Sequence, residues 1–255
     1  MKKQIIAIAL ILLFNIVTYA QQSDSGYVIY EETTRLDIKI DGEMAAMIKD
    51  LPTERKSEKI LWFSPQASLY DNYIKEGENT ADAGYWVSED NIRMTVVEPV
   101  NKVFVDLEKK EMIEQREFMT RMFLITGDLP DKEWKITGEQ EMILDYPCIV
   151  ATSTDASGVI TRVWFTPSIN IPAGPGQLCS LPGLVLKVDI DEGKRLLEAK
   201  NISFDNPGKE VFEKPSKGKK VTRDEFDTIV AEKMKEMGME SGKAEGGTVV
   251  IRIRK

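Results

Sequence analysis

The sequence predicts a mainly β protein of the α+β class: a curved antiparallel sheet, half-barrel or bowl-like, built as a meander of hairpins with one helix near the C-terminus. Short segments of alternating apolar and polar residues recur along the chain, and closely spaced turn residues separate them. Such short connections favour antiparallel pairing, since parallel strands need long crossovers. At 255 residues the chain can form a full core within a single all-β domain.

The first 20 residues have the pattern of a cleavable signal peptide. Two lysines open the chain, an apolar run extends from Ile5 to Val17, and Thr18-Tyr19-Ala20 offers small residues to a signal peptidase, so we expect cleavage before Gln21. A membrane anchor is the alternative, but the uninterrupted apolar stretch is too short to span a bilayer, and no later segment is long and apolar enough. The pattern predicts a periplasmic or secreted protein of a Gram-negative envelope.

Alternating segments from residue 21 to 206 predict the β domain. We expect strands, in chain order, at residues 26–30, 36–40, 60–63, 68–70, 91–98, 102–107, 111–116, 121–125, 134–138, 141–144, 148–154, 159–166, 184–190 and 195–204. Turn residues at 41–42, 64–66, 155–158 and 191–194 mark hairpins. Residues 44–51 form a short segment that contains two methionines and is a candidate helix.

The tail, residues 207–255, predicts a linker, an amphipathic helix and a terminal strand that pack on the same domain. A capping box at Thr222-Arg223-Asp224-Glu225 begins the helix and Gly238 ends it. Apolar residues recur at helical spacing: Phe226, Ile229, Val230, Met234 and Met237. This stripe is typical of a face packed on a sheet, with partner binding as the alternative. Residues 248–254 alternate like a strand that could pair with an open sheet edge.

Composition excludes several functions. The chain has no histidine, which removes Ser-His-Asp and Cys-His catalysis and the usual catalytic zinc sites. Loss of Lys2 and Lys3 with the signal would change the formal charge from −8 to −10, and an acidic protein is a poor candidate for nucleic-acid binding. The two cysteines, Cys148 and Cys179, predict a disulfide in an oxidising compartment; two buried thiols or a soft-metal site are the alternatives. We predict no cofactor and no metal site.

The segment from Trp164 to Ile190 carries the strongest signature. Its prolines and glycines fix the backbone, so it is predicted to be a rigid apolar crossing between two strands. The candidate binding-loop residues are Trp164, Pro172, Gly174, Pro175, Leu181, Pro182, Gly183 and Leu184. A purely structural clamp is one interpretation of this loop, and a recognition loop at the mouth of a curved sheet is the other.

This segment resembles the GLPGLI family of exported Bacteroidetes proteins. The matching residues are Trp164-Phe165-Thr166-Pro167, Ile169 to Pro172, Gly174-Pro175, Cys179 and the naming motif Leu181-Pro182-Gly183-Leu184. Cys148, residues 69–70 and the tail segment 219–226 fit the family as well. Ser180 and Val185 depart from it, in place of the first Gly and the last Ile of the motif. The resemblance implies an exported protein and says little about activity.

The residues favour a non-catalytic binding or accessory module for an apolar ligand or an outer-membrane partner. One alternative is a carboxylate-based hydrolase, which needs no histidine, with Asp189, Asp191 and Glu192 as the nearest cluster of carboxylates. The same turn is a candidate calcium site, since carboxylates near a glycine turn suit a hard cation. A further alternative is a protein-interaction module that acts through the C-terminal helix.

Overall fold

The computed structural model of the chain describes residues 24–35, 54–75, 84–87, 93–96 and 98–236. The predicted signal peptide, the strand at 36–40 with its turn at 41–42, the candidate helix at 44–51, Met237, Gly238 and the terminal strand at 248–254 lie outside these residues. Within them, no helix has the length and apolarity needed to cross a membrane.

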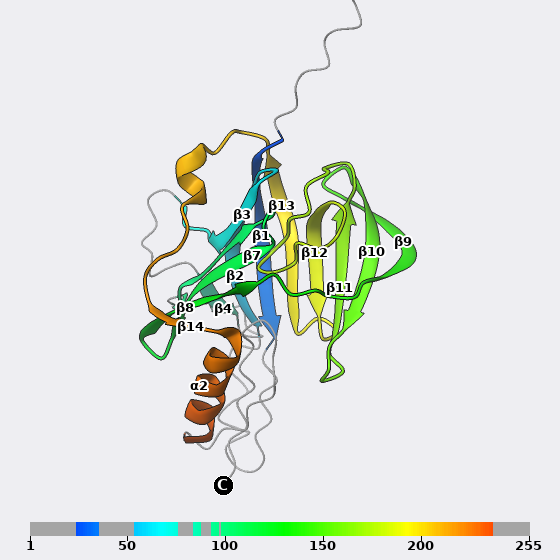
Figure 1. Cartoon of the computed structure of the whole chain (residues 1–255). Coiled ribbons are helices and arrows are strands. Elements are labelled where there is room, and N and C mark those ends of the chain that lie inside the picture. The colour runs from blue at the N-terminus through cyan, green and yellow to red at the C-terminus, as the bar shows by residue number, and fades with distance from the viewer. Residues whose placement is uncertain (1–23, 36–53, 76–83, 88–92, 97, 237–255) are drawn as a thin grey trace, which may run out of the picture.

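The described residues form one curled, almost wholly antiparallel sheet, which confirms the predicted fold class (Figure 1). Its strands are β1 (Gly26–Arg35), β2 (Glu54–Phe63), β3 (Ala67–Asn72), β4 (Gly84–Val87), β5 (Arg93–Val96), β6 (Asn101–Asp106), β7 (Glu111–Phe118), β8 (Arg121–Asp128), β9 (Lys135–Ile143), β10 (Tyr146–Thr154), β11 (Ile160–Thr166), β12 (Leu184–Ile190), β13 (Arg195–Ser203) and β14 (Lys219–Val221). The order across the sheet is β14-β8-β7-β6-β3-β2-β1-β13-β12-β11-β10-β9, and β4 and β5 extend from β2.

Most neighbours in this order are sequence neighbours joined by tight turns. The turns predicted at 64–66, 155–158 and 191–194 connect β2 to β3, β10 to β11 and β12 to β13. At the last of these, Asp191, Glu192 and Gly193 all have positive φ. The pairing of β1 with β13 is the long-range contact that joins the N-terminal and C-terminal halves of the sheet.

The strands β4 and β14 were not predicted, and β9 differs from the prediction. Residues 134–138 and 141–144 were expected to form two strands, but a single strand, β9, runs through them. Gly138 has φ 83° inside this strand, and the register against β10 shifts between Ile149 and Ala151. A bulge therefore absorbs the break between the two predicted segments.

The tail begins with a 3-10 helix, η3 (Lys209–Phe212), and continues into β14 and the helix α2 (Arg223–Glu236). The capping box is present: the Thr222 N–H donates to Glu225 Oε2 at 2.8 Å, and the Glu225 N–H donates to Thr222 Oγ1 at 3.2 Å. β14 pairs with β8 in parallel, within the segment predicted to be a linker. Phe226 of α2 packs on Phe123 and Ile125 of β8, so the stripe faces the sheet as predicted.

Candidate functional site

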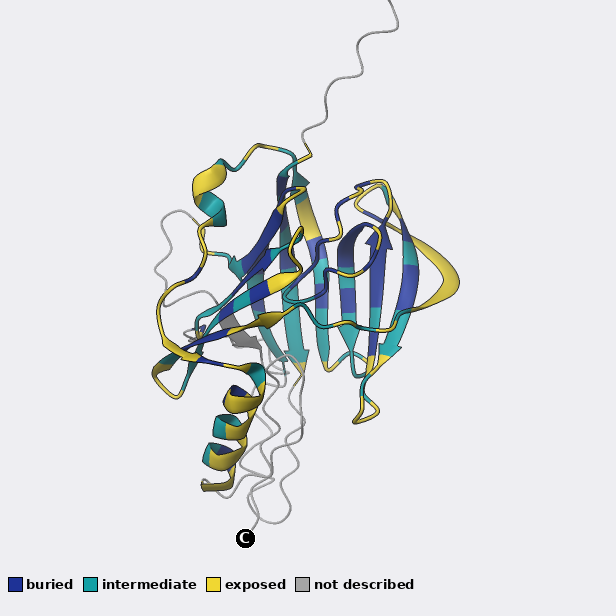
Figure 2. Ribbon diagram, viewed as in Figure 1, coloured by how far each residue is buried: buried dark blue, intermediate teal, exposed yellow. Residues whose placement is uncertain are grey.

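The segment 167–183 fills the apolar half of the concave face of the sheet. Buried residues are concentrated along the strands of the sheet (Figure 2). The main core cluster unites Val28, Leu61 and Val105 of the sheet with Ile171 and Leu181 of this segment. Within the segment, Cys179 Sγ lies 3.8 Å from Ser68 Oγ of β3. Directly after it, Val185 O of β12 accepts a hydrogen bond from the Tyr30 hydroxyl at 2.6 Å. The segment is therefore part of the core.

The candidate binding-loop residues divide by burial. Six of them are buried, namely Trp164, Gly174, Pro175, Leu181, Gly183 and Leu184, and Pro172 and Pro182 are exposed. A Cβ on Gly174 would lie 2.5 Å from Leu178 O, and one on Gly183 would lie 2.3 Å from Thr166 O. Both glycines thus permit close backbone packing.

The two cysteines are free thiols, so the disulfide predicted between them is absent from the structure. Cys179 contacts Ser68, and Cys148 Sγ lies 3.6 Å from Tyr146 O. Burial raises the pKa of each thiol to about 11, which keeps both protonated at neutral pH. They behave as apolar core residues with weak polar contacts, one of the alternatives that the sequence allowed.

Two of the three carboxylates of the predicted hydrolase or calcium cluster, Asp189 and Asp191, have local partners. Asp189 Oδ1 accepts the Gly193 N–H at 2.6 Å, and Asp191 Oδ2 pairs with Lys194 Nζ at 2.5 Å. These contacts stabilise the turn between β12 and β13. Among the described residues, no group of three or more acidic or sulfur side chains could hold a metal ion.

A cluster of buried charges occupies the other half of the concave face. At its centre Glu32 of β1 accepts two hydrogen bonds from Arg195 of β13, from Nε at 2.8 Å and Nη2 at 3.3 Å, and one from the Tyr70 hydroxyl at 3.4 Å. Burial opposes ionisation of Glu32, but Arg195, Lys59 and Arg55 outweigh it and lower the pKa of the carboxyl to about 2. Burial, chiefly, and then the charge of Glu32 raise the pKa of Tyr70.

A second carboxylate, Glu98, binds two cations of β2. Lys59 Nζ lies 3.1 Å from Glu98 Oε2, and Arg55 Nε donates to Oε1 at 2.8 Å. Lys59 also donates to Asn72 Oδ1 at 2.8 Å. Lys59 and Glu98 are both buried, which a lysine tolerates only when it is paired in this way.

A third carboxylate, Glu114 of β7, also binds two cations. Arg116 Nη1 lies 3.3 Å from Glu114 Oε1, and Arg223 at the start of α2 donates to Oε2. The Arg116 guanidinium also lies over the Phe226 ring, 5.8 Å from its centroid. Burial, together with repulsion from Arg223 and Arg195, lowers the pKa of Arg116. The helix and the sheet are thus joined through a shared carboxylate.

Sequence reasoning missed this charged cluster entirely. Glu32 and Arg195 are 163 residues apart, and Arg223 is 109 residues from Glu114. Apart from Glu98, which lies between β5 and β6, each charge stands in a strand or in the helix α2, where a charged residue ordinarily marks the solvent-exposed face. In the ion pairs named here, five cations share three carboxylates, and Asp227 of α2 is a fourth carboxylate close enough to act on Arg116 and Arg223. No short sequence motif contains this arrangement.

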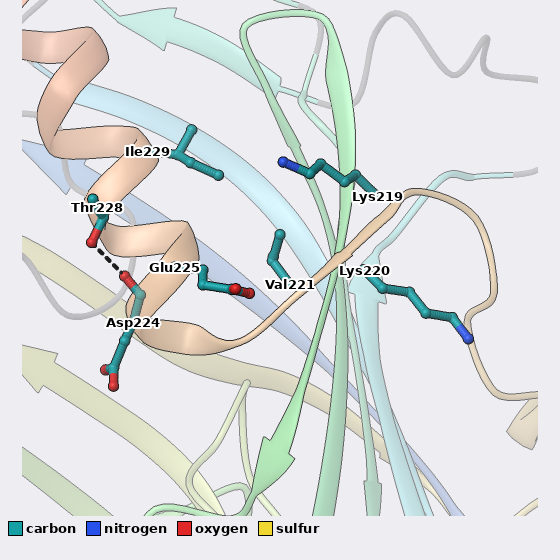
Figure 3. A pocket seen from close by; sticks show the side chains of 7 residues that line it. All are labelled: Lys219, Lys220, Val221, Asp224, Glu225, Thr228 and Ile229. Carbon is teal, nitrogen blue, oxygen red and sulfur yellow. Dashed lines mark hydrogen bonds between the residues drawn. The ribbon is translucent and has the colours of Figure 1, made fainter.

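A shallow pocket lies beside the start of α2 (Figure 3). Lys219, Lys220 and Val221 of β14 and Asp224, Glu225, Thr228 and Ile229 of α2 line it. In the close-up the two lysines extend to opposite sides of β14, and Thr228 Oγ1 donates to the Asp224 carbonyl of its own helix. Its charged groups do not converge on one point, so the buried cluster is the stronger candidate site.

Comparison with known proteins gives a family and a fold. Residues 79–236 match the family model described as "N-glycanase peptide, N-terminal domain". No curated protein matches the chain. Two solved structures of PNGF-II, in the C2 and P21 space groups, superpose with TM-scores of 0.50 and 0.52 at 15% identity in both cases. Each superposition covers 81% of this chain and 32% or 33% of the PNGF-II chain, so this chain spans about a third of the length of those proteins. At this identity the likeness concerns the fold alone.

Proposed function

Because the chain belongs to the family described as "N-glycanase peptide, N-terminal domain", we propose that it is a non-catalytic accessory module and not itself a hydrolase. The observation that carries this proposal is the state of Glu32, the central carboxylate of the cluster. Its pKa of about 2 keeps the carboxyl ionised at neutral pH. Its two oxygens accept hydrogen bonds from Arg195. Hydrolysis by paired carboxylates needs one of them protonated, with a raised pKa.

The filled core supports a module that binds through its surface. The chain's own segment 167–183 occupies the apolar half of the concave face, which argues against storage of an apolar ligand there. Phe226 and Met234 of α2 are buried, so the helix uses part of its apolar stripe within the molecule. An outer-membrane protein or another envelope component remains the partner class that we propose.

Export and the GLPGLI resemblance belong to the same proposal. Residues 1–20 and the motif Leu181-Pro182-Gly183-Leu184 support an envelope protein related to GLPGLI proteins. Intact-mass measurement of the protein from its native host tests this directly. We expect a chain that begins at Gln21, and retention of residues 1–20 would contradict export by cleavage.

The accessory role is tested with an N-glycosylated peptide as substrate. We expect the purified chain to release no glycan above a protein-free blank. Release that disappears in Glu32→Gln but persists in the matched exposed variant Glu139→Gln would overturn the proposal, because it would make the buried carboxylate a catalytic group.

A further inference from the structure

We propose that β9, an open edge of the sheet, pairs with residues 248–254 of a second copy of this chain. These residues, the terminal segment, lie outside the described part of the chain, and their sequence is Thr-Val-Val-Ile-Arg-Ile-Arg. The inference is independent of the accessory role, since it depends only on the edge strand and on the sequence of the terminal segment. It rests on the open edge, on the two different faces of β9 and on a complementary alternation in the terminal segment.

β9 is the longest open edge in the described part of the sheet. Among the described strands, β5, β9 and β14 each pair with a single neighbour. β9 has nine residues, eight of them exposed, whereas β5 has four and β14 has three. An open edge offers a row of backbone donors and acceptors to an incoming strand. β9 is therefore the edge best suited to accept another strand.

One face of β9 is apolar and exposed. Ile136 and Met142 are 52% and 64% exposed, which is unusual for large apolar side chains on a strand. Their partners in β10 are Ala151 and Pro147, which are four residues apart, so both side chains project from the same face of the sheet. Exposed apolar side chains beside an open edge favour a contact with another strand.

The opposite face of β9 is acidic. Glu139 pairs with Arg162 and Glu141 with Lys187, and both cations lie over the Trp164 ring. Each of these ion pairs uses one oxygen of the carboxylate, and the two glutamate side chains are 60% and 45% exposed. A further cation can therefore approach either carboxylate from the open edge.

The terminal segment alternates in the complementary way. Val249, Ile251 and Ile253 alternate with residues that include Arg252 and Arg254, the pattern of a strand with one apolar and one basic face. The charges of the three open edges distinguish between them. β9 carries two glutamates and one lysine, whereas β14 carries two lysines and β5 one arginine. A basic strand is therefore attracted to β9 and repelled by the other two edges.

Antiparallel pairing matches both faces in a single register. With Arg252 opposite Glu141, the second arginine of the terminal segment falls opposite Glu139. The same register places Ile251 opposite Met142. Parallel pairing that keeps the first of these contacts places the second arginine opposite an isoleucine of β9. Opposite charges and apolar pairs across two strands are both stabilising, so we infer the antiparallel arrangement.

The position of α2 favours a second copy as the donor of the segment. α2 packs on β8, and ten strand-to-strand steps separate β8 from β9, about 48 Å along the sheet (Figure 1). The linker of residues 237–247 spans at most about 40 Å when fully extended. Because the contacts then join separate copies, they add nothing to the unfolding free energy of a single chain in dilute solution.

The test is hydrogen exchange of the full chain at several concentrations, with light scattering to measure its mass. We expect the chain to associate as its concentration rises. Exchange of the β9 and terminal-segment amides should slow by about tenfold or more over the same range. Rapid exchange of β9 at every concentration would overturn the proposal. Protection of β9 in a chain that stays monomeric would place the segment on its own β9 and would overturn exchange between copies.

Variants of the full chain test the pairing and its register. Ile251→Pro removes a backbone donor from the segment and should abolish both association and protection of β9, whereas Gly246→Pro in the linker should leave both unchanged. Arg252→Glu should weaken association about tenfold, and Lys243→Glu, the same change of charge in the linker, should have little effect. Association that survives Ile251→Pro, or equal effects of the two charge changes, would contradict the proposed pairing.

Discussion

Glu32 and Arg195 form the ion pair on which the charged cluster depends. The pair is nearly buried, with side chains 12% and 13% exposed, and the carboxyl has a pKa of about 2 against an ordinary value of 4.5. Removal of one partner from a buried pair leaves the other charge uncompensated. We therefore expect Glu32→Gln to destabilise the protein by about 3 kcal/mol, measured by chemical unfolding at neutral pH. Glu139→Gln, an exposed partner of Arg162, should cost less than about 1 kcal/mol.

The same pair predicts an acid dependence of stability. Because the pKa of Glu32 is lower in the folded chain than in the unfolded chain, its contribution is fully present above about pH 5. It is lost as the pH falls toward 2, and the gap between 4.5 and about 2 corresponds to about 3 kcal/mol. Unfolding curves recorded between pH 6 and pH 2 should show a shallower decline in Glu32→Gln than in the wild type. Parallel declines would mean that other carboxylates dominate acid unfolding.

At the scale of the element, the segment 167–183 connects β11 to β12 and also fills the core. Leu181 and Leu184 are both buried, so truncation of either leaves a cavity. Leu181→Ala and Leu184→Ala should each lower the free energy of unfolding by about 2 to 5 kcal/mol, measured by denaturant titration. Met142→Ala on the exposed edge strand β9 is the matched control and should change it little. If Leu181→Ala unfolds at the same denaturant concentration as the wild type but no longer binds the partner of the protein, the recognition interpretation of the loop is favoured.

The glycines of this segment differ in what they require. At Gly183, φ is 153° and an added Cβ would meet Thr166 O at 2.3 Å, whereas at Gly176, φ is 62° and nothing lies within 4 Å. Gly176→Ala should cost only the backbone strain of positive φ, about 1 kcal/mol. Gly183→Ala must also displace backbone and should lower the melting temperature much further. Similar melting temperatures for the two variants would show that the loop relaxes around residue 183.

For the whole molecule, the sequence predicted local structure well and long-range pairing poorly. Turn residues located three hairpins, and the capping box located the start of α2, because both depend on neighbouring residues. The pairing of β1 with β13 and of Glu32 with Arg195 depends on how the sheet curls, which no short segment encodes. The loop signature was recognised, but whether its leucines face the core or solvent is decided by the concave surface opposite them.

The rates at which the two free thiols are labelled measure whether the whole sheet opens as one unit. Cys148 lies in β10 and Cys179 in the segment before β12, yet both belong to the same core cluster. The thiolate is the reactive form, and burial raises both pKa values to about 11, so neither thiol should react in the folded protein. In denaturant, alkylation followed by peptide mass analysis should label both.

Under native conditions, slow labelling should proceed at the same rate for both thiols, because exposure of either requires opening of the shared core. Faster labelling of Cys148 would indicate that the edge formed by β9 and β10 opens separately from the rest of the sheet. A failure of both thiols to react after full unfolding without reductant would show that the protein forms the disulfide after all, and that the folded arrangement of the two cysteines differs from the one described.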